Sequence, residues 1–425
     1  MRVEPGEQAL SALRRSPQGR WWLGGIGVLL VGLLATVGIA CFERNDLDIY
    51  LAASRDLLAG ANMYERRYNE YYRYFYSPSF ALLVAPLAFI GPIAAKLLWG
   101  VSIIACCLRA HLLAERWLGL HQAGPVQRAS FGFLLLLLLF QPIRDNINSM
   151  QVTALLLWLS LEGIRLIRAD RAWAGAALIA AGLDMKLLPL VLLPYLAWRA
   201  HWKALALAAL IYGALQVLPA LVTGWEGLLQ LHRSRAELLN PADPRHILDE
   251  EEPTFISLGS LLSAYLSTEG GSPSNPPLPR NLAQLELGTI NALLWAGRAA
   301  LALLALWLLR WPPFQHRSDG PALLREVGYL LLCTILFFPH QRNYSMLMAA
   351  PATAWLLHAW LSGDRGRWLA ALLVAAFLGL NTELILGEFA DVYAHYKVKS
   401  LLVIAHIAGL MAAGPPRPSR TAAPV

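Results

Sequence analysis

Apolar stretches of membrane-crossing length recur along the whole chain of 425 residues. A helix needs about 20 mostly apolar residues to cross the roughly 30 Å hydrocarbon core of a bilayer. Hydrophobic residues make up 57% of the chain and charged residues 15%, whereas a soluble domain is nearer half apolar and about a quarter charged. The sequence therefore predicts an all-α integral membrane protein and excludes a soluble protein with one large core.

Window length predicts about twelve transmembrane helices. They lie at 22–42, 80–108, 129–143, 150–167, 172–184, 186–198, 203–222, 288–310, 326–339, 344–361, 368–386 and 399–413. Segment 172–198 is alternatively one kinked helix, and the motif "APLAFIGP" is a potential break in 80–108. We expect a single transmembrane domain over 22–413, a cytoplasmic tail at 1–21 and a disordered cytoplasmic tail at 414–425.

The first apolar run, "WWLGGIGVLLVGLLATVGIACF", follows Arg14, Arg15 and Arg20. A cleaved signal peptide is the alternative to a membrane anchor. The run is longer than the apolar core of a signal peptide, and no A-x-A cleavage site stands before the polar segment that follows. The sequence favours an uncleaved anchor.

Positive charges in the short loops set the predicted orientation. With a cytoplasmic N-terminus, the loops on the same side carry Arg and Lys residues, as the positive-inside rule requires. The polar loops then share the extracytoplasmic face of the inner (plasma) membrane, and both termini are cytoplasmic. These extracytoplasmic segments are 43–79, 143–150, 184–189, 223–287, 340–343 and 386–398.

Several classes of function are excluded. The net charge of +7 is spread over the loops and forms no basic face, so we expect no nucleic acid partner. No Gly-rich phosphate loop of the Walker or dinucleotide kind is present. The cysteines, Cys41, Cys106, Cys107 and Cys333, have no metal-like spacing and are interpreted as packing residues. We expect neither a metal nor a cofactor.

Two carboxylates, Asp46 and Asp48, follow the first apolar run in "NDLDIYLAASRDLLAG". The apolar residues after them predict an amphipathic helix along the membrane surface. One interpretation is that both acids cap the N-terminus of this helix, where a carboxylate is favoured by about 0.3–1 kcal/mol. The other is a general base at the lipid–water boundary, where partial desolvation raises the basicity of a carboxylate.

Lys186 lies inside the apolar motif "AAGLDMKLLPLVLLP", where a lysine costs about 2.5–3.5 kcal/mol at the centre of a transmembrane helix. It either pairs with Asp184, extends to the interface, or binds a lipid-linked phosphate. Arg144 and Arg342 stand at corresponding span ends and are candidates to complete a phosphate clamp, since guanidinium groups match phosphate oxygens. Each arginine taken alone is better explained as an ordinary loop charge.

A cluster of tyrosines and a large loop complete the polar features. The cluster is interpreted as an interfacial aromatic belt, with a contribution to an acceptor groove as the alternative; it comprises Tyr64, Tyr68, Tyr71, Tyr72, Tyr74 and Tyr76. The loop at 223–287 is expected to be a partly mobile lid. Its acidic run, 249–252, is expected to be a solvated face.

Three motifs carry a family resemblance, in the same order as in the family. They are "DLDIYLAASRDLLAGANMY", "YSPSFALLVAPLAFI" and the segment from "MQVTALLLWLSLEGIRL" to "LPYLAWRAHWKA". Over most of residues 40–360 the chain resembles the polyprenol-phosphate-sugar-dependent mannosyltransferases of glycosyltransferase family 87, the DUF2029 group. The resemblance implies a GT-C glycosyltransferase fold with extracytoplasmic loops that carry short amphipathic helices.

The resemblance also implies roles for individual residues. The catalytic base of the family begins a D-[LF]-x-[VI]-Y pattern, which assigns the role to Asp46 and includes Tyr50. Gln151 stands in a partly kept G-Q-[VI]-N element, and Lys186 begins an intact K-x-x-P element. The remaining candidates for donor or acceptor binding are Asp48, Tyr76, Asn146, His340 and Asn343.

Two family elements are altered. Phe255 replaces the Asn of an N-x-S-[LF] element. In "FPHQRNYS", Arg342 takes the place of a Trp, and Tyr344 and Ser345 take the places of two His residues. His340 lies four residues too early to inherit their role. We therefore expect a donor or acceptor preference that differs from that of other members.

The resemblance thus implies a polyprenyl-phosphate-linked sugar donor, with a glycolipid or polysaccharide as acceptor. Mannose is the expected sugar, with arabinofuranose left open. One inverting displacement on the extracytoplasmic face would convert a β-linked donor into an α-linked product. The alternative is a transporter or flippase of a lipid-linked sugar, which predicts functional polar residues near the membrane midplane. A non-catalytic assembly subunit is disfavoured by the intact patterns at Asp46 and Lys186.

Overall fold

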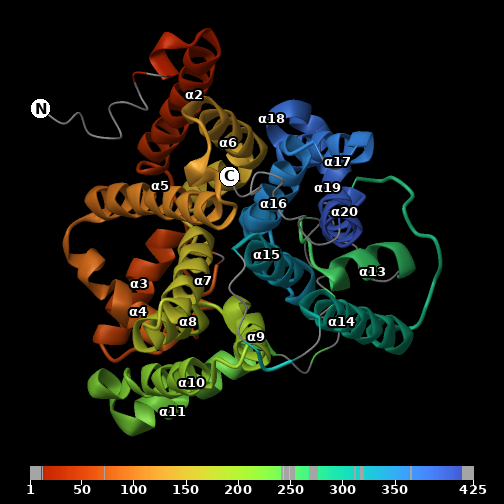
Figure 1. The fold of residues 1–425 in the computed structure, drawn as a ribbon. Coiled ribbons are helices and arrows are strands. Elements are labelled where there is room, and N and C mark those ends of the chain that lie inside the picture. Colours follow the sequence, from red (N-terminus) through yellow and green to blue (C-terminus); the bar gives the residue numbers. More distant parts are fainter. Residues whose placement is uncertain are drawn as a thin grey trace, which may run out of the picture.

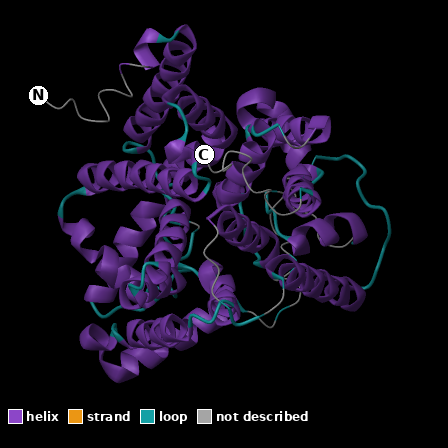
Figure 2. Cartoon of the chain, in the orientation of Figure 1, coloured by secondary structure: helices purple, strands orange, loops and turns teal. Residues whose placement is uncertain are grey.

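A computed structural model describes residues 11, 13–70, 72–240, 243, 248, 254–267, 276–310, 313–315, 320–363 and 366–413. Within these ranges the chain is helical, and its strand-like pairing is the single bridge between Tyr68 and Tyr72 (Figure 2). The predicted all-α membrane fold is confirmed. Most of the two predicted tails, Tyr71 and the acidic run 249–252 lie outside the described residues.

The helices are arranged around a central group that contains α15 and α16 (Figure 1). In chain order they are α2 (Pro17–Ala40), α3 (Asp46–Leu58), α4 (Pro78–Val84), η1 (Ala85–Phe89), α5 (Pro92–Trp117), η2 (Leu120–Gln122), α6 (Pro125–Asn148), α7 (Thr153–Arg168), α8 (Ala172–Met185), η3 (Leu188–Val191), α9 (Leu192–Trp198), α10 (Trp202–Val217), α11 (Ala220–Leu239), α13 (Leu258–Leu266), α14 (Leu287–Leu309), α15 (Gly320–Phe337), η4 (Asn343–Ala349), α16 (Ala350–Leu361), α17 (Gly366–Leu380), α18 (Thr382–Leu386), η5 (Gly387–Phe389), α19 (Ala390–His395) and α20 (Val398–Ala412).

Five of the described helices, α2, α5, α6, α14 and α15, are long and apolar enough to cross a membrane. Two bent pairs, α10 with α11 at 88° and α17 with α18–α19 at 75°, raise this number to seven if each pair is one span. The predicted apolar stretches are all helical, some of them as shorter helices. The prediction of about twelve crossings stays a prediction.

The predicted span 80–108 is broken rather than continuous. Gly91 has a φ of 85°, and Pro92 begins α5 directly after it. Glycine adopts positive φ without a steric cost, and proline fits the first turn of a helix because its missing N–H is not needed there. As a result α4 and η1 pack beside α3, while α5 runs as a separate long helix.

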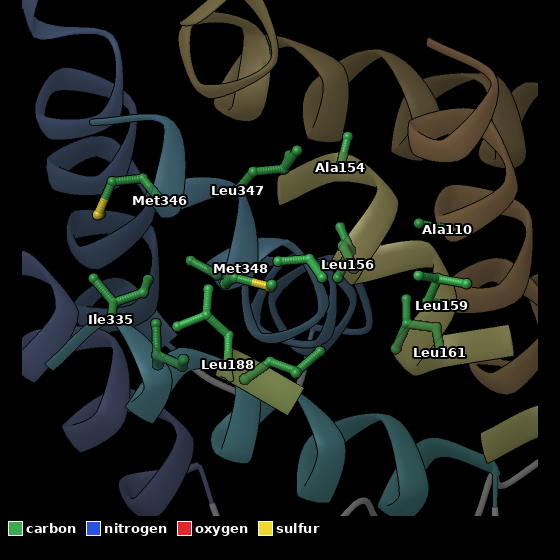
Figure 3. Packing of buried hydrophobic residues seen from close by; sticks show 14 of the residues in the cluster. Ala110, Ala154, Leu156, Leu159, Leu161, Leu188, Ile335, Met346, Leu347 and Met348 are labelled. Carbon is green, nitrogen blue, oxygen red and sulfur yellow. The ribbon is translucent and has the colours of Figure 1, made fainter. Parts of the chain in front are cut away.

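The segments that carry the predicted site residues rest on a shared apolar core. Figure 3 shows Leu156 of α7, Leu188 of η3 and Met348 of η4 close together, and each is at most 1% exposed. Arg199, directly after α9, pairs with Glu326 of α15 at 2.5 Å, and both side chains are almost completely buried. These contacts fix the short helices η3 and η4 against α7 and α15.

Two glycines allow α7 and α8 to approach closely. A Cβ atom added at Gly175 of α8 would lie 2.5 Å from the carbonyl oxygen of Gly163 in α7 and 2.6 Å from Ile167 Cγ1. Small residues at such crossings let helix backbones pack in a membrane, where the hydrophobic effect gives little attraction between helices. The crossing fixes the direction in which α8 delivers the segment after Met185.

Substitution Gly175→Ala should destabilise the protein by about 1–3 kcal/mol, because the methyl group overlaps the backbone of α7. Thermal unfolding of the purified protein in detergent measures this effect. The matched control is Gly213→Ala in α10, where an added Cβ meets nothing within 4 Å, so no loss of stability is expected. Equal unfolding midpoints for the two variants would contradict the close crossing.

Candidate active site

The N-terminus of α3 separates the two neighbouring acids into different roles. Asn45 is the N-cap, and its backbone N–H donates to Asp48 Oδ2 at 3.0 Å. This is half of a capping box, in which the third helical residue satisfies the N–H of the cap. The capping interpretation is thus correct for Asp48, whereas the Asp46 carboxylate takes no part in this bond.

Lys96 of α5 fixes the same helix end. Its side chain is 7% exposed, and Nζ lies 2.9 Å from Asp48 Oδ2 and donates to the Glu43 carbonyl at 2.6 Å. A buried ammonium group requires such partners, since an unpaired buried charge is strongly unfavourable. The link between α2 and α3 and the start of α3 are therefore tied to α5.

Asp46 is held by the turn between α6 and α7. Its backbone N–H donates to the Ser149 carbonyl at 3.2 Å, and Gln151 Nε2 donates to its Oδ2. The Tyr76 hydroxyl in turn donates to Gln151 Oε1 at 3.1 Å. The same Tyr76 hydroxyl accepts from the Tyr50 hydroxyl at 2.8 Å. Four predicted site residues from distant parts of the sequence thus form one hydrogen-bonded chain.

Aromatic rings enclose this chain. The Tyr50 ring lies edge-on to Tyr76 at a centroid distance of 4.8 Å, to Phe80 at 5.3 Å and to Trp99 at 6.2 Å. Edge-to-face contacts of this kind stabilise aromatic clusters beyond the area that they bury. The cluster packs around Tyr50, at the opposite end of the hydrogen-bonded chain from Asp46.

The tyrosine cluster is mostly not an exposed belt. Tyr64, Tyr68 and Tyr74 are buried, and their hydroxyls donate to backbone or carboxylate oxygens at 2.7–2.8 Å. A buried hydroxyl needs such an acceptor. Tyr72 is half exposed, and Tyr71 lies outside the described residues. The belt interpretation is therefore wrong for the three buried tyrosines, which pack behind the site.

Lys186 lies at the break between α8 and η3. It has an extended backbone, and Nζ stands 5.4 Å from the centroid of the Tyr344 ring. Asp184 accepts instead from Ser77 Oγ at 2.9 Å and from Gln216 Nε2 at 2.6 Å. In the part of the chain that the structure describes, no ion pair joins Lys186 to Asp184, so the pairing interpretation is not supported.

Arg342 approaches from the segment before η4. Its guanidinium group lies 5.7 Å from the centroid of the Phe255 ring, and the same ring meets His340 edge-on at 5.3 Å. Asn146 Nδ2 donates to the Tyr344 carbonyl at 2.9 Å and thereby holds η4 against α6. The two altered family elements, at Phe255 and Arg342, are thus in contact with each other.

The three charged groups Asp46, Lys186 and Arg342 come together. Burial raises the pKa of Asp46 from its usual value near 4 to about 6, while the positive charges of Arg342 and Lys186 lower it. A carboxylate in this range accepts a proton near neutral pH, as a general base must. The site combines a proton acceptor with two cations.

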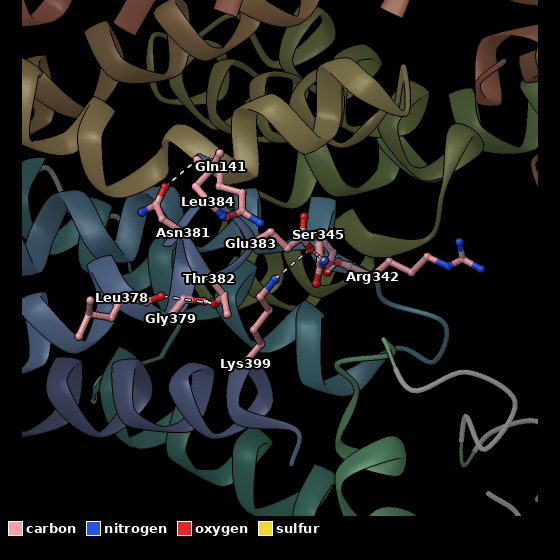
Figure 4. A network of polar contacts seen from close by, with 11 residues as sticks. Gln141, Arg342, Ser345, Leu378, Gly379, Asn381, Thr382, Glu383, Leu384 and Lys399 are labelled. Carbon is pink, nitrogen blue, oxygen red and sulfur yellow. Dashed lines mark hydrogen bonds and ion pairs between the residues drawn. The ribbon is translucent and has the colours of Figure 1, made fainter. Parts of the chain in front are cut away.

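Other predicted residues face different partners. The charge of Arg144 acts on Asp145, and Asn343 Nδ2 donates to Glu383 Oε1. Figure 4 shows the Arg342 side chain pointing away from Glu383 and Lys399. Sequence reasoning missed Glu383 and Lys399, although charged residues at the ends of apolar segments are a recognisable signal.

No group of three or more His, Cys, Asp or Glu side chains is placed to share a metal ion among the described residues. The charged groups that face one another near Asp46 are one carboxylate and two cations, a set that suits an anionic substrate. The arrangement is able to remove a proton and to stabilise a phosphate leaving group.

Residues 74–339, more than half of the chain, match the family model described as glycosyltransferase family 87. The chain belongs to glycosyltransferase family 87. Sugar transfer at a membrane is therefore its activity, and the predicted family is confirmed. The family 87 match includes Tyr76, Gln151 and Lys186 but begins after Asp46 and ends before Arg342. No curated protein matches the sequence of the chain.

Substitution Asp46→Asn should stabilise this family 87 protein at pH 7. The folded state binds the Asp46 proton more tightly than the unfolded state, so the wild-type free energy of unfolding falls as pH rises from about 4 to about 6. Asparagine does not ionise and avoids this loss of folding free energy. The loss reaches its maximum, about 3 kcal/mol, above pH 6. Thermal unfolding at pH 3 and pH 7 measures the difference, which should disappear at pH 3, below the pKa of the unfolded state.

The neighbouring substitution Asp48→Asn is the control with the opposite sign. It removes the negative charge that pairs with Lys96 and leaves a weaker, uncharged acceptor for the Asn45 N–H, and should lower the stability at pH 7. A variant Asp46→Asn that is less stable than the wild type at pH 7 would show that the Asp46 carboxylate is not strained by burial.

Proposed function

We propose that this enzyme transfers a sugar from a polyprenyl-phosphate donor to an acceptor hydroxyl at the extracytoplasmic membrane face, in one inverting displacement. The proposed sugar is mannose, and the proposed acceptor is a glycolipid or polysaccharide. The observation that carries the proposal is the half-buried Asp46 carboxylate, held by Gln151 and facing the positive charges of Lys186 and Arg342.

Asp46 takes the proton of the acceptor hydroxyl, and the acceptor oxygen attacks the anomeric carbon of the donor sugar. The bond between that carbon and the phosphate oxygen breaks, and its electron pair leaves with polyprenyl phosphate. Lys186 and Arg342 stabilise the charge that develops on the phosphate, an electrostatic contribution that is usually a large part of catalysis. The proton on Asp46 then passes to water.

Gln151 orients the base. Its amide donates to Oδ2 of Asp46, and Tyr76 holds the amide in this orientation through Oε1. Among the described residues Oδ1 of Asp46 has no hydrogen-bond donor, so this oxygen is available to the acceptor hydroxyl. The hydrogen-bonded chain through Tyr50 thus fixes which oxygen receives the proton.

An apolar cavity supports a lipid-linked donor. It has a volume of about 500 Å³ and lies between α2, α5, α6, α7 and α16. Apolar side chains dominate its lining; among them are Leu30, Leu33, Leu135, Leu139, Leu161 and Ala354. Ile143 and Leu347 also line it, each three residues from Asn146 and Tyr344, which are hydrogen-bonded to each other. The cavity therefore reaches within about one helical turn of the charged site.

The family match names a transferase, and no observation favours a transporter. The charged residues of the site also gather at the ends of helices, at α3, after α8 and before η4. A flippase would instead require functional polar residues near the midplane.

Substitution Asp46→Asn should reduce sugar transfer by about 10²–10⁴-fold, the usual contribution of a general base. Purified protein with a radiolabelled polyprenyl-phosphate sugar and a cell-envelope lipid extract provides the assay. The wild-type rate should rise with pH through about 6 as Asp46 loses its proton. Lys186→Met should mainly raise the KM for the donor.

Glu237→Gln and Lys203→Met are matched controls, because both side chains are exposed and lie in other helices. Their rates should equal that of the wild type. Transfer that survives in Asp46→Asn would exclude the base assignment. Movement of lipid-linked sugar across vesicles without any transfer would support a flippase.

Substitution Ala354→Leu narrows the apolar cavity and should weaken binding of a long-chain donor. A tenfold rise in KM, equal to about 1.4 kcal/mol, is expected for a donor with ten or more isoprene units. A donor with three isoprene units does not extend as far into the apolar cavity, so the KM for this donor should be unchanged. Ala208→Leu, at a buried position in α10 outside the cavity, is the control for general destabilisation. Equal effects on both donors would contradict a role of this cavity in chain binding.

A further inference from the structure

A second cavity, polar in character, lies beside the candidate active site. Its volume is about 230 Å³, and it is formed by α18, α19, the start of α20 and residues 254–256. This is smaller than the roughly 300–1,000 Å³ of sites for drug-sized ligands, and it suits a ligand of about one saccharide unit. The polar residues of its lining include Asn343, Glu383, Asp391, Tyr393, Lys397 and Lys399.

Some of these polar groups build the wall of the cavity. Lys397 Nζ donates to the Phe255 carbonyl at 3.1 Å, and Ser400 Oγ donates to the Ile256 carbonyl at 2.7 Å. Both side chains are buried. These bonds join α20 to the 254–256 segment and give the cavity a fixed shape.

Other groups are available to a ligand. The Glu383 side chain is 40% exposed; it accepts from Asn343 and lies 3.8 Å from Lys399 Nζ. Asp391 of α19 also lines the cavity and is exposed. Carboxylates accept from hydroxyls, while amide and ammonium groups donate to them. Two carboxylates balance two ammonium groups, so the lining suits a neutral polyol better than a phosphate or a uronic acid.

The polar cavity adjoins the proposed donor site through residues 342 and 343. Figure 4 shows the Arg342 side chain on one side of this segment and Glu383 with Lys399 on the other. Phe255 lines the polar cavity, and its ring also contacts the Arg342 guanidinium group. The polar cavity and the group that we assign to the donor phosphate therefore share the Phe255 side chain.

We infer that the polar cavity binds a neutral saccharide unit of the acceptor, and that Glu383 and Asp391 accept hydrogen bonds from its hydroxyls. This inference rests on the proposed function, because it treats the bound sugar as part of the acceptor. The unit in the cavity is not the one that reacts, since Asp46 is not among the lining residues.

The test is glycan binding by the full-length protein in lipid nanodiscs. The probes are an array of neutral oligosaccharides of mannose, glucose, galactose and arabinose, together with matched oligosaccharides that contain uronic acid. The wild type should bind at least one neutral class in preference to its uronic acid counterpart. Glu383→Gln and Asp391→Asn should each weaken this binding at least tenfold.

The matched control is Glu388→Gln, an identical charge change at an exposed residue of η5 that does not line the cavity. Its binding should equal that of the wild type. Thermal unfolding shows whether each variant is folded. If Glu383→Gln does not fold, the glycan binding of Asp391→Asn tests the inference. Binding that neither cavity variant weakens, a preference for uronic acids, or no binding by the wild type would each overturn the inference.

Asp46→Asn separates this inference from the proposed function. The variant should bind the neutral glycan as the wild type does, because the carboxylate lies outside the cavity. Cavity-dependent glycan binding without transfer from any polyprenyl-phosphate sugar would refute the proposed function and leave the saccharide site in place. Transfer that is lost in Asp46→Asn but unchanged in both cavity variants would refute the saccharide site alone.

Discussion

The partial burial of one carboxylate at a helix start, that of Asp46, is the constraint around which the polar part of this molecule is built. Asp46 is costly to ionise where it lies, and three separate parts of the chain reduce this cost: the Gln151 amide, and the charges of Lys186 and Arg342. Each group comes from a break between helices. The apolar core beneath η3 and η4 keeps these breaks in register.

The sequence predicted the helices well, because their apolar windows and their breakers are local signals. Gly91 and Pro92 divide α4 from α5, and the K-x-x-P element coincides with the end of α8. The spacing of residues alone did not show which of Asp46 and Asp48 caps the helix and which is the candidate base. The family resemblance favoured Asp46, and the structure gives the physical distinction, since Asp48 satisfies the N-cap and Lys96.

Contacts between distant segments were beyond sequence reasoning. Nothing local indicates that the Tyr64 and Tyr74 rings pack inward, or that Asn343 meets Glu383. The same holds for Phe255 and Arg342, which separately depart from the family pattern. In space they form one cation–π contact, worth about 0.5–2 kcal/mol. The two positions that differ from the expected pattern are therefore in contact, and the aromatic ring of one supports the cation of the other.

The Lys96 contacts have a consequence for the response of this protein to its lipid surroundings. Lys96 lies in the first turns of α5, a helix of 26 residues, and is tied to both sides of the α3 start. Helices longer than the hydrocarbon thickness tilt to reduce the mismatch. The position of α5 in the bilayer and the position of the helix start that presents Asp46 are therefore linked through one buried side chain.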